Sequence, residues 1–295
     1  MKCNICPRAC QVDRASGRLG FCRAPDALLV AKIMLHSWEE PCIAGKGGAG
    51  TIFFSGCNLR CAFCQNCDIS RGEMGEIMSD EVLEDKIFGR AEQGAECIEF
   101  VTPTHYTERL AEILRRVKPR LNIPIVWNSG GYESVESLRM LEGLVDVYLP
   151  DFKYFDNEIA RAYSSAPDYL EIASAALGEM LRQTGKPIMS EDGRLLRGVI
   201  LRHLVLPGHR ADSIDVLNHI ADSFGAESLL LSLMSQYTPD FYAASGDCRY
   251  KNLTRRVTKF EYDSVMKVAL ERGFDGYFQG MSAASKSFTP NFSEK

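Results

Sequence analysis

The sequence lacks several features that mark particular classes of protein. No apolar run approaches the roughly 18 residues that a membrane-spanning helix needs. The polar N-terminus MKCNICPRAC is not followed by the apolar segment of a signal peptide. An excess of positive charge is also missing, because the net charge is −5 and the pI is about 5.7. We therefore expect a cytoplasmic protein that binds neither membranes nor nucleic acid.

The composition is that of a globular protein with an unusual distribution of cysteine. The chain has 295 residues, of which 45% are hydrophobic and 25% charged, enough for one large domain or two ordinary ones. It contains 11 cysteines, and all but Cys97 and Cys248 precede residue 68. In a reducing compartment, clustered cysteines are more often metal ligands or catalytic thiols than disulfides. Two metal sites in the first quarter of the chain are the simplest interpretation.

Strand-like and helix-like segments alternate six times after residue 50. The apolar strand segments are 51–56, 97–102, 124–129, 145–153, 196–208 and 228–237. The helical segments are 79–93, 108–118, 133–143, 156–185, 211–225 and 261–273. This order predicts a parallel sheet covered by helices, either doubly wound or barrel-like, with functional groups at the carboxyl ends of the strands.

The segment GCNLRCAFCQN places three thiols at the end of the first of these strands. The cysteines Cys57, Cys61 and Cys64 have the spacing C-x3-C-x2-C and can wrap one face of an iron–sulfur cluster. A closed [4Fe–4S] site has four thiolates, so three leave one iron open for another ligand. Two alternatives remain, namely a zinc site completed by Cys67 and reduced thiols that bind no metal.

This motif resembles the signature of the radical S-adenosylmethionine (SAM) superfamily, C-x3-C-x-aromatic-C after a first strand. Within it, the chain resembles the activating enzymes of glycyl radical enzymes, such as pyruvate formate-lyase activating enzyme, and their uncharacterised homologues. The shared segments include CxxCPRxCxxxR, GTIFFSGCNLRCAFCQN, VTPTHY, DFK, LRHLVLPG and MSQY. The resemblance implies a partial (β/α)6 TIM-like barrel, a [4Fe–4S] cluster on Cys57, Cys61 and Cys64, and SAM as cofactor.

The resemblance also implies residues that contact SAM. They are Phe63 through its backbone, Thr102 and Thr104 after the second strand, Asn128 and Ser129 after the third, the pair Asp151 and Lys153, and Arg202 on the fifth strand. A surface ion pair is the alternative for Asp151 and Lys153, and a position on the rim is the alternative for Arg202. Two histidines near strand ends, His105 and His203, are either proton donors or hydrogen-bonded wall residues.

The first four cysteines have the spacing of a tetrahedral metal site. Cys3, Cys6, Cys10 and Cys22 suit structural zinc or a second iron–sulfur cluster equally, with an unligated cap as the third interpretation. The segment is too short to bury a core of its own, so a metal would stabilise it.

We expect three parts, a cysteine-rich cap (1–48), a radical SAM core (49–240) and a C-terminal helix and tail (241–295). The expected reaction is reductive cleavage of SAM followed by hydrogen abstraction, with electrons from a donor such as a flavodoxin or ferredoxin. Residues 234–239 differ from the activases at the end of the sixth strand. The substrate therefore stays open between a protein glycine, a peptide and a small molecule, and a non-enzymatic zinc or iron–sulfur protein is the rival of a different class.

Overall fold

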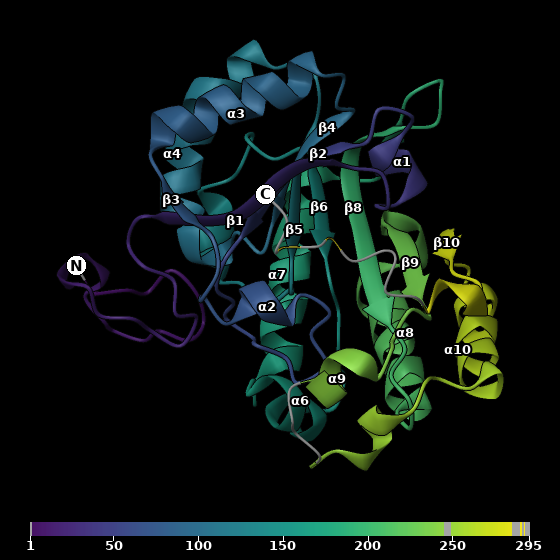
Figure 1. The fold of residues 1–295 in the computed structure, drawn as a ribbon. Coiled ribbons are helices and arrows are strands. Elements are labelled where there is room, and N and C mark those ends of the chain that lie inside the picture. The colour runs from purple at the N-terminus through teal and green to yellow at the C-terminus, as the bar shows by residue number, and fades with distance from the viewer. Residues whose placement is uncertain (1, 245–248, 285–289, 291, 293–295) are drawn as a thin grey trace.

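A computed structural model describes residues 2–244, 249–284, 290 and 292 (Figure 1). The strands are β1 (Leu28–His36), β2 (Ala49–Phe54), β3 (Glu76–Met78), β4 (Cys97–Val101), β5 (Ile125–Ser129), β6 (Val147–Pro150), β7 (Ile188–Met189), β8 (Leu195–Leu204), β9 (Leu230–Met234) and β10 (Gly276–Phe278). The helices are α1 (Pro41–Ala44), α2 (Cys67–Ser70), α3 (Asp80–Glu92), α4 (Thr107–Val117), α5 (Val135–Arg139), α6 (Asn157–Ser164), α7 (Tyr169–Thr184), α8 (Arg210–Phe224), α9 (Asp240–Ala244) and α10 (Lys259–Glu271).

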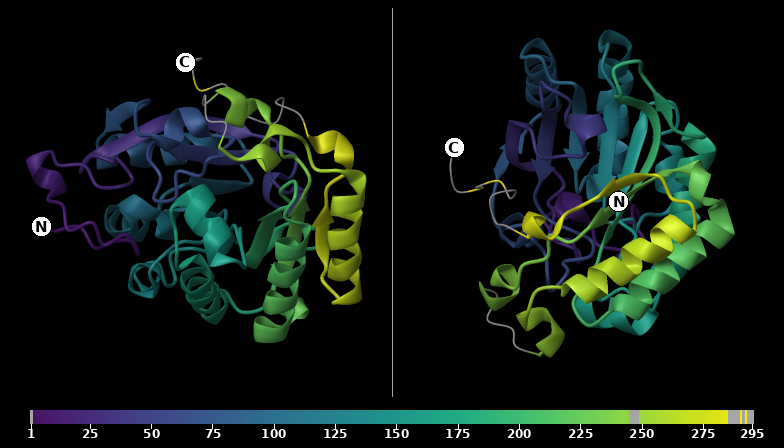
Figure 2. Two further views of the ribbon diagram at one scale, coloured as in Figure 1. Left: turned by 90° about the horizontal axis from the view of Figure 1, so that it is seen from below. Right: turned by 90° about the vertical axis from the view of Figure 1, so that its right-hand side faces the viewer.

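One mostly parallel sheet organises the molecule. Its order is β10-β9-β8-β6-β5-β4-β2-β1-β3, with β7 paired to β8, and the path does not close on itself. All six predicted strands are present as β2, β4, β5, β6, β8 and β9, and they run parallel to one another. The predicted partial barrel is confirmed, and helices line the outer face of its curved sheet (Figure 2).

Four strands were not predicted from the sequence. The longest, β1, pairs antiparallel with β2 and also carries β3, and β10 adds to the opposite edge beside β9. The domain boundaries at residues 48 and 240 stay predictions. The structure adds that β1 from the first part and β10 from the last both belong to the central sheet. In the C-terminal tail, residues 285–289, 291 and 293–295 lie outside the described residues.

Side chains alternate between the two faces of each parallel strand. On β4, Ile98 and Phe100 face the helices and belong to the large cluster that includes Leu110 and Leu114 of α4. Cys97 instead belongs to a smaller cluster inside the sheet's curve, with Cys42 and Ile43 of α1. The α1 segment therefore packs inside the curve, at the amino ends of the parallel strands.

The N-terminal segment, purple in Figure 1, packs beside the carboxyl ends of the strands. Arg8 donates hydrogen bonds to the carbonyl oxygens of Asn58 at 2.7 Å and Ser164 at 2.8 Å, and its guanidinium lies 4.0 Å from the ring centre of Phe21. Ser134 donates to the carbonyl of Ile5 at 3.0 Å. The segment is thus anchored on the loops that follow β2 and β5. Within the described part of the chain, no helix is long and apolar enough to cross a membrane.

Candidate functional site

A tight turn carries the chain from β2 into the cysteine loop. Gly56 has φ +88°, and a Cβ there would lie 2.6 Å from the carbonyl oxygen of Cys22, so only glycine fits without a shift. The same carbonyl accepts a hydrogen bond from the Cys57 amide at 3.2 Å. Farther along, the Ala62 amide donates to the carbonyl of Tyr163 at 2.7 Å. The loop that bears Cys61 is therefore held by backbone contacts on both sides.

Two of the three cysteine sulfurs of the motif accept a hydrogen bond from a described residue. The Leu59 amide lies 3.4 Å from the sulfur of Cys57, and the Ser164 hydroxyl donates to the sulfur of Cys61 at 2.9 Å. Burial raises the pKa of Cys64, and the charges of Cys61 and Cys57 add to the rise, as expected of three thiols gathered in one place. Donors aimed at sulfur stabilise thiolates, as the groups around metal ligands do.

The thiol of Cys67 donates a hydrogen bond, whereas the sulfurs of Cys57 and Cys61 accept one. The Cys67 thiol donates to a carboxylate oxygen of Asp68 at 3.7 Å. Burial raises the pKa of Cys67, as it also does for Cys61 and Cys64, so the distinction rests on the direction in which the Cys67 thiol points. Cys67 lines a second hollow on the other side of the loop, whereas the three motif cysteines line the main cavity. These contacts disfavour Cys67 as a fourth ligand beside Cys57, Cys61 and Cys64.

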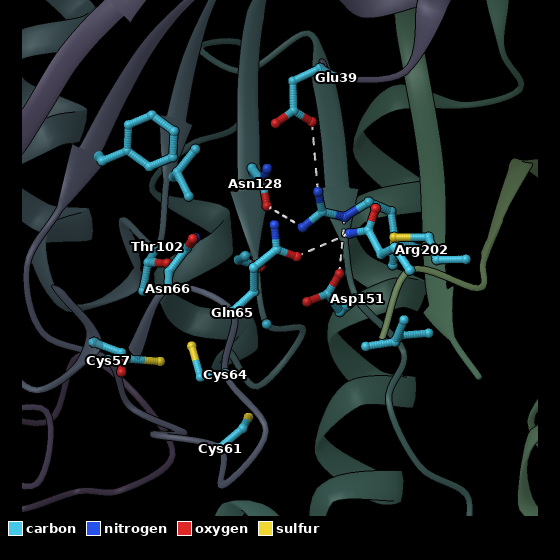
Figure 3. A pocket seen from close by; sticks show the side chains of 18 of the residues that line it. Glu39, Cys57, Cys61, Cys64, Gln65, Asn66, Thr102, Asn128, Asp151 and Arg202 are labelled. Atoms are coloured by element: carbon cyan, nitrogen blue, oxygen red, sulfur yellow. Dashed lines mark hydrogen bonds and ion pairs between the residues drawn. The ribbon is translucent and has the colours of Figure 1, made fainter. Parts of the chain in front are cut away.

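The main cavity has a volume of about 320 Å³ and lies inside the curve of the sheet. Figure 3 shows the three cysteines at one end, Glu39 at the other, and Arg202 between them. Among the predicted SAM contacts, Phe63, Thr102, Asn128, Ser129, Asp151, Lys153 and Arg202 line this cavity. The volume falls in the usual range for small-molecule sites.

Thr104 lies outside the cavity lining. Its side chain is buried and donates to the carboxylate of Glu133 at 3.0 Å. The same carboxylate accepts from Trp127 at 2.9 Å and from the Ser129 hydroxyl at 2.7 Å. Thr104 and Ser129 thus share one buried acceptor that positions the ends of β4 and β5. Glu133 was not recognised in the sequence, where it lies in a polar helical start.

Asp151, Lys153 and Arg202 form a buried charge network. Asp151 accepts from Lys153 at 2.5 Å and from Arg202 at 3.0 Å, and all three side chains are less than one-fifth exposed. Burial raises the pKa of Asp151, but the charges of Arg202 and Lys153 outweigh it and leave the pKa below its ordinary value. The surface ion pair considered from the sequence is therefore wrong.

The network extends along the floor of the sheet to residues that the sequence did not reveal. Arg202 donates to the amide oxygen of Asn128 at 2.7 Å, and Asn128 donates to Glu99 at 2.7 Å. The carboxylate of Glu39 lies 3.6 Å from Arg202. A signal for Glu99 was available, because it is the one charged residue in the apolar strand CIEFV. Glu39 belongs to the segment WEEP, which carries no recognisable motif.

Thr102 adopts a strained backbone at the edge of the cavity. Its φ is +56°, a region that β-branched residues rarely occupy. A hydrogen bond helps to maintain this conformation, because the Thr102 amide donates to the carbonyl of Asn128 at 2.9 Å. Strain of this kind concentrates at functional sites, and here it turns the chain at the carboxyl end of β4.

Two buried histidines act as wall residues. One ring nitrogen of His105 donates to the carbonyl of Ser55 at 3.0 Å, and one of His203 donates to the carbonyl of Phe152 at 2.6 Å. Burial lowers the pKa of His105 to about 3 and that of His203 to about 4. Neither lines the cavity, so the geometry favours a structural role for both.

The four N-terminal cysteines lie within electrostatic reach of one another. Burial raises the pKa of Cys6 to about 12, and the charges of Cys22, Cys10 and Cys3 contribute to the rise. The Phe21 amide lies 3.4 Å from the sulfur of Cys10. The four N-terminal cysteines therefore lie near one another, and the backbone of Cys22 lies beside Gly56 at the start of the cysteine loop.

The donor set at the cysteine loop fits an iron–sulfur cluster. Across the described ranges, no three Cys, His, Asp or Glu side chains enclose a point where one metal ion would sit. A four-iron cluster spreads its thiolates over the corners of a cube, whereas zinc needs sulfur at about 2.3 Å. Three cysteine sulfurs on one cavity, without a fourth cysteine in its described lining, match an open cluster site.

Comparison with known proteins agrees with this geometry. Residues 43–156 match the family described as a 4Fe-4S single cluster domain. An uncharacterised protein of Methanocaldococcus jannaschii, MJ0674, is 30% identical over 284 residues, which cover 92% of this chain and 75% of the relative. The crystal structure of methylornithine synthase (PylB) shares the fold with a TM-score of 0.50 at 16% identity, over 79% of this chain and 66% of that one.

A further match is looser and supports no assignment. A domain of pyruvate-formate lyase-activating enzyme from Bacteroides vulgatus superposes with a TM-score of 0.45 at 13% identity, over 62% of this chain and 98% of that domain. The interpretation as an iron–sulfur protein does not depend on this match. The cysteine motif, the matched 4Fe-4S domain and the fold shared with methylornithine synthase already agree with it. The chain therefore belongs to the same protein family as MJ0674 of Methanocaldococcus jannaschii, and its matched domain agrees with the iron–sulfur cluster that the cysteine motif predicts.

Proposed function

We propose that this protein is a radical SAM enzyme that abstracts hydrogen from a small-molecule substrate. The observation that carries the proposal is the convergence of three cysteine residues on one cavity, with the thiol of Cys67 directed to Asp68 instead. When bound, a reduced [4Fe–4S] cluster supplies the electron that cleaves SAM to methionine and a 5′-deoxyadenosyl radical, which takes a hydrogen atom from the substrate.

The chain's own residues would hold and orient the cofactor. Cys57, Cys61 and Cys64 would bind three irons. Lys153 and Arg202 supply positive charge for a carboxylate, and Asp151 supplies oxygen acceptors for an ammonium group. Burial of these charges strengthens their electrostatic interactions and keeps water away from a reactive radical.

The cavity supports a small substrate better than a protein glycine. Its described lining includes Pro290 near the C-terminus, and the Phe292 ring lies 5.3 Å from that of Phe53. The α1 segment packs at the opposite end, where Cys42 and Ile43 are buried. A glycine-bearing loop of a second protein would have to displace such contacts, so activation of a glycyl radical enzyme is the second candidate.

The electron donor would approach from the outer side of the cysteine loop. Cys61 lines both the main cavity and the second hollow, so this loop is thin at that residue. Arg60 and Arg71 line the hollow and are exposed, which suits an acidic partner such as a flavodoxin or ferredoxin. If the N-terminal cysteines bind a second metal centre, the hydrogen bond from the Cys57 amide to the Cys22 carbonyl would place it beside the first.

Anaerobic reconstitution with iron and sulfide, followed by SAM and dithionite, tests the catalytic assignment. The wild type and Cys67→Ala should form 5′-deoxyadenosine, and Cys61→Ala should form none. The two cysteines are matched because both line the second hollow, Cys61 on the cysteine loop and Cys67 at the start of α2. Equal product from Cys61→Ala would reject the assignment of SAM cleavage to a cluster on this loop, and no product from cluster-loaded wild type would favour a non-enzymatic iron–sulfur or zinc protein.

A further inference from the structure

The end of the cavity farthest from the cysteines has an unusual carboxyl group. Glu40 lines the cavity and is only 9% exposed. Its Oε2 atom is fully buried and has no hydrogen-bond partner among the described residues. A buried oxygen without a partner costs free energy, so native proteins rarely leave one unless a ligand or ion completes it.

This region also has more carboxyl groups than positive charges. Glu39, Glu40 and Glu99 all interact electrostatically with Arg202, which is already bonded to Asp151. Lys153 is likewise committed to Asp151. Burial raises the pKa of Glu39 well above its ordinary value, the charges of Glu99 and Glu40 and an interaction with the Glu40 carboxyl add to the rise, and Arg202 only partly opposes it. A cation in this place would relieve the repulsion that now favours protonation.

The walls between the two ends combine the polar network around Arg202 with apolar side chains. Phe53, Leu204, Met234 and Tyr277 line the cavity, and Glu39 lies across it from the cysteines (Figure 3). The segment 37–48 leads from the end of β1 to the start of β2, and therefore lies at the amino ends of the parallel strands. A ligand anchored there would extend toward the carboxyl ends, where the cofactor site begins.

From these observations we infer that Glu39 and Glu40 bind the positively charged group of the substrate, an ammonium or guanidinium on a short aliphatic chain. The inference rests on the proposed function only for the reaction that follows binding. Hydrogen would be abstracted from the part of the substrate's aliphatic chain that lies nearer the cysteines. Binding itself requires no SAM cleavage, and the two claims are tested by separate measurements.

Calorimetry on the cluster-loaded protein, without reductant, tests the inference with n-butylammonium and n-butylguanidinium as probes and n-butanol as the neutral counterpart. At least one cation should bind at least about 10-fold more tightly than the alcohol, because charged hydrogen bonds exceed neutral ones. Glu40→Gln should weaken that binding by about 10- to 100-fold. Glu112→Gln, an exposed change on α4, should leave it unaltered.

Several outcomes would overturn the inference. They are equal affinity for cation and alcohol, no measurable binding of either cation, and full affinity in a folded Glu40→Gln variant. Displacement of the cation by SAM would assign the acidic pair to the ammonium group of SAM itself. If Glu40→Gln fails to fold, the comparison of cation and alcohol on the wild type still tests whether the cavity prefers a positively charged ligand. Failure to form 5′-deoxyadenosine with cation binding intact would reject the proposed function alone.

Discussion

Replacing Arg202 by methionine should destabilise the protein in a pH-dependent way. The guanidinium bonds Asp151 at 3.0 Å and Asn128 at 2.7 Å, and lies 3.6 Å from Glu39. Methionine would fill much of the space but leave the buried carboxyl groups without their shared cation. Breaking a buried ion pair in this way costs about 3–5 kcal/mol, which corresponds to a fall in Tm on the order of 10 °C.

The sign of the pH dependence follows from the direction of the pKa shifts. In the wild type, Arg202 helps to hold the pKa of Asp151 below its ordinary value, and it opposes the upward shift that burial causes in Glu39. Without Arg202 the folded-state pKa of both groups rises, while the unfolded-state pKa does not change. The folded variant therefore binds more protons than the wild type, and its deficit in stability should grow as the pH rises from 4 to 8.

Anaerobic thermal unfolding of the cluster-loaded protein between pH 4 and pH 8 measures this effect. Arg115→Met, an exposed change on α4, is the matched control and should shift Tm by little at any pH. Adding Glu39→Gln to Arg202→Met should recover part of the loss, because it removes one of the uncompensated acids. A Tm deficit that is the same at both ends of the pH range would refute the view that Arg202 neutralises buried carboxylates.

The remaining predictions concern the cap, the outer hollow and the last helix. Cys6→Ser should release metal from the N-terminal site but not from the Cys61 site, as elemental analysis and 5′-deoxyadenosine formation would show; unchanged metal content would leave the cap unligated. Charge reversal at Arg60 and Arg71 should slow reduction by flavodoxin at least several-fold without affecting reduction by dithionite, and equal slowing of both would disprove docking there. Glu261→Ala should cost about 1–3 kcal/mol at pH 7, because it removes a helix cap and a hydrogen-bonded ion pair. Hydrogen bonding to Arg255 lowers the pKa of Glu261, so the loss of stability in the variant should become smaller as the pH falls below 4.5. Denaturation midpoints of wild type and variant that differ equally at pH 3 and pH 7 would contradict this prediction.

The sequence by itself determined the order of the core and the metal-binding loop. Apolar runs and amphipathic segments specify β2, β4, β5, β6, β8 and β9 because buried parallel strands need continuous apolar residues. The predicted helical segment 79–93 is present as α3, and Ser79 caps it by accepting a hydrogen bond from the Val82 amide. These signals are local, since each depends on residues only a few positions apart.

Only the tertiary structure decided which polar groups meet. Glu39 follows β1, Glu99 lies on β4 and Arg202 on β8, and nothing in their separate neighbourhoods indicates contact. The spacing of the cysteines also left open whether Cys67 is a fourth metal ligand. The answer depends on whether its thiol faces the cavity or Asp68, and the structure directs it to Asp68. Contacts between distant segments arise from the curvature of the sheet and the packing of α1 inside it, which no local pattern of residues encodes.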